Sequence, residues 1–159
     1  MQLKNIIKSV GDILNIQDNA TIRRCANLVL GNIAANHRDC IATQTFNVTD
    51  NKIRYSDFEK TFLRIHRINV EHSLYVNYIR VPNGRVTVKY GYIPEFINDD
   101  DEIIIPNLTE QCFTYGVLTE YAIINGMFNE ARIWSDKFEA ELFGTSPKNR
   151  NIVLPARAK

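Results

Sequence analysis

The chain has 159 residues, of which 45% are hydrophobic and 23% are charged. This length and composition suit one globular domain that buries roughly two thirds of the surface of its unfolded chain. Nineteen basic and 18 acidic residues leave a net charge of +1, so no overall field draws the protein onto nucleic acid, and any such binding would have to be local.

Two amphipathic helices are predicted at the start of the chain. In the stretch of about 2–15, apolar residues recur at i, i+3, i+4 and i+7 and therefore fall on one helical face. Asp18 or Asn19 offers a side-chain oxygen to cap the next apolar stripe, over 20–36. We expect these two helices to be joined by a short turn and packed against each other.

Strands are predicted within 41–105, because the hydrophobic period changes there from the helical to the alternating pattern. The runs 43–48 and 52–56 flank a polar turn and predict a hairpin, and 62–70 predicts a further strand. The apolar run 103–105 predicts a short strand or an extended segment.

A second hairpin is predicted over 74–93, where Asn83-Gly84 separates two β-rich runs. Both residues tolerate a positive φ, which a two-residue hairpin turn requires. The implied register gives one apolar and aromatic face and one mixed face with exposed basic residues. The pairs expected on the apolar face are Val81 with Val86, Ile79 with Val88, Asn77 with Tyr90, and Tyr75 with Tyr92.

Two further helices are predicted in the last third of the chain. Asn107, followed by Glu110, has the spacing of a capping box and predicts a helix over 107–125. Gly126 interrupts the apolar pattern, which resumes over 127–143. Either two helices meet at this glycine or one long helix bends there, and we favour two helices packed as a hairpin.

Together these elements predict an α+β fold, a helical bundle with an inserted antiparallel β-sheet. We expect residues 1–146 to form a single domain and 147–159 to form a flexible C-terminal arm. After Gly144 the sequence has two prolines, four basic residues and no acidic residue. Its apolar patch, 152–154, is too short for a core of its own and would need a partner to order it.

The search for catalytic motifs is negative. The sequence contains no P-loop, no dinucleotide-binding fingerprint, no HExxH and no GxSxG. His37, His66 and His72 are scattered, and a histidine in a strand, such as His66, is more often a surface or core-edge residue than a catalyst. We therefore expect a protein that is not an enzyme, with no catalytic, cofactor-binding or metal-binding residues and no cofactor.

Four adjacent acidic residues, Asp99–Glu102, allow two interpretations. They could bind Ca²⁺ or Mg²⁺, but the alternating oxygens, the glycine and the distant glutamate of an EF-hand are missing. We favour a solvated loop, or a loop that contacts a basic neighbour.

Cys25, Cys40 and Cys112 lack the spacing of metal ligands and predict free thiols in a reducing compartment. The sequence has no run of about 18 apolar residues, which a membrane span would need. The N-terminal stretch has no signal-peptide core. Trp134 and its aromatic neighbours could be the core of the helical pair or part of a subunit contact.

The order of these elements resembles that of the head-to-tail adaptor, or connector, proteins of tailed bacteriophages. The resemblance is strongest over 84–142, with VTVKYGYIP, an acidic loop closing on IIIP, and TYGVLTEYAIINGMFNEARIWSDKFEAEL. It is fair over 50–68, where DNKIRYSDF precedes LRIHRI, and so covers somewhat more than half of the chain. The resemblance is one of spacing and residue type, and no functional residue of the family has a fixed identity to carry over.

The resemblance implies a structural virion protein made in the host bacterial cytoplasm and located at the junction of capsid and tail. It would form a homo-oligomeric, dodecameric ring that binds the portal protein, completes the head after DNA packaging, and receives the tail or further connector proteins. It would touch passing DNA only weakly and would contact no membrane.

Two sets of residues are candidates for these contacts. By the resemblance, the arm would dock on the portal or a neighbour through Lys148, Arg150, Ile152, Val153, Leu154 and Arg157. Basic residues near the predicted hairpin tip would face the DNA channel, and these are Arg80, Arg85 and Lys89.

Two other classes of function stay open. One is a small nucleic-acid-binding regulatory protein that uses Arg23-Arg24 on the second helix, which salt-dependent DNA binding by the monomer would support. The other is an enzyme with an unrecognised site, which a deep pocket with convergent titratable groups would support.

Overall fold

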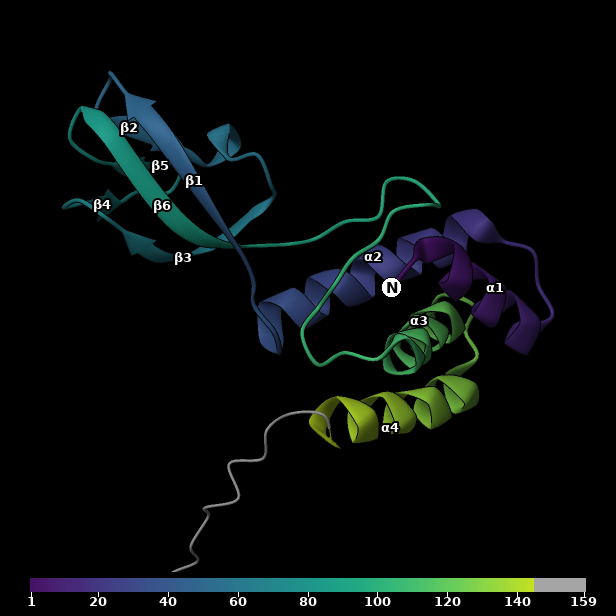
Figure 1. Cartoon of the computed structure of the whole chain (residues 1–159). Helices are drawn as coiled ribbons and strands as arrows, with labels where there is room; N and C mark the ends of the chain where they lie inside the picture. The colour runs from purple at the N-terminus through teal and green to yellow at the C-terminus, as the bar shows by residue number, and fades with distance from the viewer. Residues whose placement is uncertain (145–159) are drawn as a thin grey trace, which may run out of the picture.

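The computed structural model of the chain describes residues 1–144 and shows an α+β fold (Figure 1). The strands lie together on one side of the molecule and the helices on the other. The described helices are α1 (Leu3–Leu14), α2 (Asn19–Asn36), α3 (Glu110–Ile124) and α4 (Phe128–Gly144). The strands are β1 (Cys40–Val48), β2 (Lys52–Arg54), β3 (Phe62–Ile68), β4 (Ser73–Leu74), β5 (Tyr78–Arg80) and β6 (Gly84–Tyr92), and a 3-10 turn, η1, covers Tyr55–Asp57.

The four predicted helices are confirmed, with ends that differ by at most three residues from those expected. The Asp18 carboxylate caps α2 by accepting a hydrogen bond from the Thr21 backbone N–H at 3.1 Å. Hydrogen bonding from Thr21 also holds the pKa of Asp18 below its usual value. Gly126, at φ 71°, separates α3 from α4, so the chain forms two helices rather than one bent helix.

The predicted capping box at the start of α3 is wrong. Asn107 lies two residues before the cap, in a left-handed conformation at φ 57°. The cap is Thr109, whose Oγ1 accepts a hydrogen bond from the Cys112 backbone N–H at 3.0 Å. Pro106 and the left-handed Asn107 turn the chain before the helix starts, so the helix begins three residues later than the spacing indicated.

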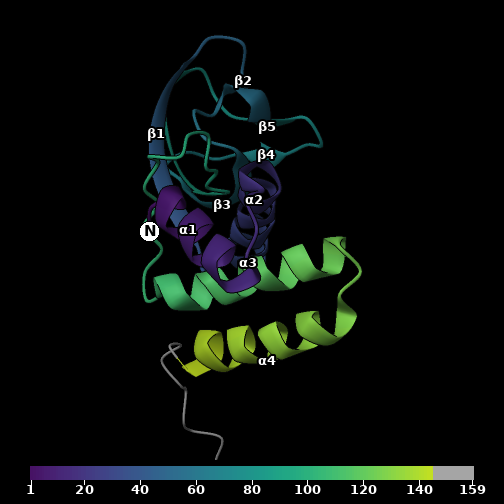
Figure 2. The same ribbon diagram turned by 90° about the vertical axis from the view of Figure 1, so that its right-hand side faces the viewer.

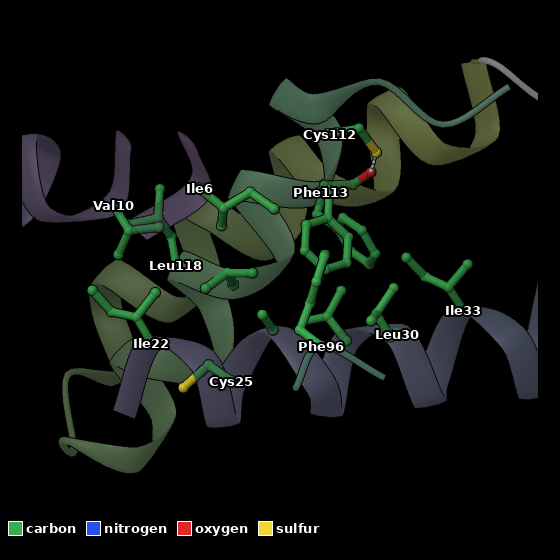
Figure 3. Close-up of a cluster of buried hydrophobic side chains, with 14 of the residues drawn as sticks. Ile6, Val10, Ile22, Cys25, Leu30, Ile33, Phe96, Cys112, Phe113 and Leu118 are labelled. Carbon is green, nitrogen blue, oxygen red and sulfur yellow. Dashed lines mark hydrogen bonds between the residues drawn. The ribbon is translucent and has the colours of Figure 1, made fainter. Parts of the chain in front are cut away.

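The helical core is built around α3, which packs against α1, α2 and α4 (Figure 2). Figure 3 shows apolar side chains from α1, α2 and α3 meeting in one cluster, with Phe96 from the segment after β6 inserted among them. Phe96 is fully buried and its ring meets that of Phe113 edge-on, with centroids 6.2 Å apart. The Asn27 amide holds this segment on α2 by two hydrogen bonds with the Phe96 backbone, of 2.8 and 3.0 Å.

The backbone of Gly116 lies so close to the side chains of Val29 and Phe138 that a side chain at this position would collide with them. An added Cβ would lie 2.9 Å from Val29 and 3.1 Å from Phe138. We expect Gly116→Ala to lower the free energy of unfolding by about 1 kcal/mol, because overpacking costs about 1–3 kcal/mol and the gain in helix propensity offsets about 1 kcal/mol. Urea denaturation measures the change.

Gly31, inside α2, is the matched control for this substitution. Its added Cβ would meet only Ile93, at 4.0 Å. Gly31→Ala should therefore raise the free energy of unfolding by up to about 1 kcal/mol. Equal effects of the two substitutions would contradict the tight contact at Gly116.

The strands form two antiparallel three-stranded sheets, in the orders β1-β6-β3 and β2-β5-β4. Their inner faces share one apolar cluster, separate from that of the helices. The central strand β6 contributes Val86, Val88 and Tyr90 to it, and the second sheet contributes Ile53 and Ile79. The two sheets therefore enclose a small core of their own.

The hairpin predicted over 74–93 is wrong, and with it the four expected pairs. Strand β6 pairs with β1 and β3, whereas β5 pairs with β2 and β4. The run before Asn83 is not one strand, because it turns back within itself: the Tyr75 N–H donates to the Tyr78 carbonyl at 2.9 Å. The Asn83 side chain instead accepts a hydrogen bond from the Asn51 N–H at 2.8 Å, which ties together two of the loops that connect the sheets.

A smaller strand prediction also fails. The runs 43–48 and 52–56 do not pair with each other, because β1 and β2 belong to different sheets. The segment 103–105 forms no strand of the described chain. Next to it, a single bridge links Gln2 to Glu102. The strand predicted over 62–70 is confirmed as β3, with bulges that shift its register against β6.

The sheets are fastened to the helices at the C-terminal end of α2. The Arg64 guanidinium donates to the carbonyls of Ala34 and Ala35, at 3.1 and 2.7 Å, and lies 3.4 Å from the Asp39 carboxylate. These are the carbonyls that a helix end leaves without partners, and a cation is favourable there. Tyr92 packs against both apolar clusters and so joins them.

Candidate functional site

The carboxylates of the acidic run Asp99–Glu102 pair with basic and N–H groups of the same chain. Asp99 pairs with Arg23, Asp100 with Lys4 at 3.2 Å, and Glu102 lies 3.9 Å from the N-terminal ammonium group. The Asp101 carboxylate accepts hydrogen bonds from two backbone N–H groups of its own loop. These hydrogen bonds hold the pKa of Asp101 below its usual value. The prediction of a loop that contacts a basic neighbour is confirmed, and the neighbours are α1 and α2.

The described residues, 1–144, gather no three metal-ligating side chains in one place. His66 lies 3.6 Å from Asp39, beside the Arg64 contact described above. The three cysteines are buried free thiols. Burial raises the pKa of Cys25 and of Cys112 to about 11, and it also raises that of Cys40.

Basic side chains gather on the outer face of the first sheet. Arg85 and Lys89 alternate with the inward residues of β6, and Arg67 of β3 is the register partner of Lys89. All three are exposed and form what we call the basic face. Arg67 was missed from the sequence, because strict alternation in LRIHRI puts it on the face of Leu63 and Ile65, and only the register shift after Ile65 places it opposite Lys89.

Arg80, the third predicted basic residue, lies elsewhere. It is on β5 in the second sheet, paired in register with Lys52 and Ser73. The structure therefore brings together Arg85 and Lys89 but not Arg80, because β5 and β6 do not form the expected hairpin.

Two groups of exposed apolar residues lie on different parts of the molecule. The sheet-tip cluster comprises Leu74, Tyr75 and Val76 at the turn between β4 and β5, and Val76 is 92% exposed. The turn cluster comprises Ile124 and Phe128 at the connection of α3 and α4, and Phe128 is 70% exposed. Figure 1 shows these two connections on opposite sides of the molecule.

Trp134 is half-buried on α4. Its ring stacks on Tyr115 of α3 with centroids 5.7 Å apart, and the Lys137 ammonium lies 4.6 Å from the ring centre. Trp134 packs against the helical core, which agrees with the prediction that the aromatic residues of this helical pair are core residues.

A hollow of about 330 Å³ lies between α2, α3 and α4. We call it the helical groove. Its floor is apolar, with Val29, Phe138 and Leu142, and Glu120 and Glu139 are among its walls. Phe143 lines the end of the groove nearest to the last described residue, and its ring meets the His37 ring edge-on at 6.0 Å.

The predicted docking residues of the arm, Lys148 to Arg157, lie outside the described residues. None of the helices in residues 1–144 is long and apolar enough to cross a membrane. A comparison of the chain with models of known protein families finds no match. A search of the curated proteins also finds none that matches.

Proposed function

We propose that the chain is a subunit of an oligomeric ring that joins the portal vertex of a tailed-phage capsid to the tail. In this role it completes the head after DNA packaging and acts as a structural protein without catalysis. The ring is dodecameric, by the resemblance described above, and its neighbours are the portal protein and the tail or further connector proteins. The protein is then located in the virion.

The observation that carries this proposal is the presence of two separate apolar clusters on one chain. A ring needs a heterologous interface, in which one patch of a subunit meets a different patch of the next. The sheet-tip cluster and the turn cluster lie on different elements and on opposite sides of the molecule, which suits such an interface. Exposed apolar patches of this kind often mark protein contacts.

The basic face is the surface proposed to meet DNA in the channel. Arg67, Arg85 and Lys89 project from a sheet, and no acidic residue lies at their register partners on β1 or β6. Passing DNA requires weak, sequence-independent contact, which a few exposed cations on a flat sheet provide.

The nucleic-acid-binding regulator receives less support. It required Arg23 and Arg24 on α2, but the Arg23 guanidinium is paired with Asp99 of the same chain. A helix that reads bases needs its arginines free to enter a groove.

Negative-stain imaging of the purified chain, alone and mixed with virion particles, tests the proposal. We expect rings, or added density at the capsid-tail junction. A chain truncated after residue 146 should keep its helical circular dichroism but fail to dock, because the arm carries the portal contact. Absence of the protein from the particle would contradict the proposal. Unfolding of the truncated chain would show instead that the arm belongs to the core.

A further inference from the structure

The helical groove offers an apolar floor between acidic side chains. Its lip includes Ile123, which is 46% exposed although it faces a hollow lined by Val29, Phe138 and Leu142. Glu120 and Glu139 stand on its α3 and α4 walls. Such a groove fits a short apolar segment that is flanked by cations.

The sequence that follows α4 contains such an apolar segment with basic flanks. Residues 110–144, which form α3 and α4, contain six acidic and two basic side chains, a net charge of −4. Residues 145–159 contain four basic side chains and no acidic one, a net charge of +4. The apolar run Ile152–Leu154 lies between Arg150 and Arg157, so an apolar centre with basic flanks matches an apolar floor with acidic walls.

The described chain ends beside the groove, and the sequence that follows is long enough to reach across it. Phe143 lines the groove, and the described chain ends at the next residue, Gly144. Seven residues separate Gly144 from Ile152, and seven extended residues span about 23 Å. The α3 wall from Gly116 to Ile123 rises only about 10 Å.

We propose that the Ile152–Leu154 segment of the arm docks in the helical groove of its own chain. The three apolar side chains cover the floor, and the flanking arginines pair with Glu120 and Glu139. The segment of the same chain is favoured over that of another copy, because a short tether gives an effective concentration of about a millimolar. This inference does not rest on the proposed ring, although in a ring the portal would compete with the groove for the arm.

An engineered disulfide in the full chain tests this docking. Ile123→Cys and Val153→Cys together should form an intrachain disulfide under mild oxidation at neutral pH. The three native thiols do not interfere, because all are buried and burial raises their pKa, to about 11 for Cys25 and Cys112. The product is identified by mass spectrometry and by its mobility without reductant.

The matched control pairs Val153→Cys with Ile13→Cys. Ile13 is 47% exposed, like Ile123, but lies on α1, which does not line the groove. We expect the Ile123 pair to cross-link at least about tenfold faster than the Ile13 pair. Equal rates would overturn the proposal, and cross-links that form only between two chains would overturn docking within one chain.

The charge pairing is tested in the same full-chain background. Glu120→Gln with Glu139→Gln should slow formation of the Ile123 disulfide by at least about threefold at low salt, and the difference should shrink at high salt. Unchanged rates would overturn the role of the two carboxylates. Because the readout is a bond within one chain, it is independent of whether rings form.

Discussion

Val76→Asp should abolish assembly of the proposed ring while leaving the fold of the monomer unchanged. Val76 is 92% exposed at the tip of the second sheet, so a carboxylate there is solvated in the free chain. In an interface the same carboxylate would be buried without a partner, at a cost of several kcal/mol. Light scattering coupled to size-exclusion chromatography, with negative-stain imaging, measures assembly, and far-ultraviolet circular dichroism checks the fold.

Phe128→Asp should have the same effect at the other cluster, and mixing the two variants distinguishes the type of interface. Each variant keeps one working patch, so a heterologous interface allows the mixture to form a dimer and nothing larger. Ile97→Asp is the control, since Ile97 is 70% exposed, as Phe128 is, but lies in neither cluster. Rings formed by either single variant would contradict the assignment of the two clusters.

Phe96→Ala should cause the largest loss of stability, about 3–5 kcal/mol in the free energy of unfolding. The ring is buried between α2 and α3, and its removal leaves a cavity where the segment after β6 joins the helical core. Urea denaturation followed by circular dichroism measures the change. A loss below about 1 kcal/mol would mean that this segment is not docked as described.

Asn27→Ala tests the same attachment through its hydrogen bonds. It leaves the buried Phe96 N–H and carbonyl without partners, at a cost of about 1–3 kcal/mol. Asn27→Ala and Phe96→Ala both weaken the attachment of this segment to α2. The loss in the free energy of unfolding of the double variant should therefore be smaller than the sum of the two single losses. Ile97→Ala, next along the chain but exposed, should change the free energy by no more than about 0.5 kcal/mol.

The helices could be predicted from the sequence because their signals are local. Apolar spacing, the Asp18 cap and Gly126 each act within a few residues, and the helices end close to where these signals place them. The pairing of the strands could not be predicted in this way. Asn83-Gly84 is a strong turn signal, but it connects strands of two different sheets.

The choice of partner for β6 depends on contacts far apart in the sequence. Its inward residues Val86, Val88 and Tyr90 pack against Ile53 and Ile79 of the second sheet, and β1 pairs with it along its whole length. Strand β5 has only three residues and could not pair with β6 along its whole length. A turn at Tyr75–Tyr78 shortens that strand, and the sequence signal for this turn was a single Asn77 within an apolar run.

The candidate surfaces were predictable in part for the same reason. Exposed cations on β6 follow from strand alternation alone, so Arg85 and Lys89 were placed together correctly. Arg67 joins them and Arg80 does not, because both outcomes depend on which strands are neighbours. The helical groove has no sequence signature, since it forms only where α2 packs against the consecutive helices α3 and α4, which are distant from it in the sequence.

The contact of Arg64 with the end of α2 bears on the curvature of an assembly. One proposed contact surface lies on the sheets and the other on the helices, and Arg64 fastens the sheets to the helices. In the proposed ring, a change of the angle at this joint would change the angle between the two surfaces. Because closure fixes the product of the rotation per copy and the copy number, the contacts at this joint, although remote from both surfaces, would affect how many subunits the circle holds.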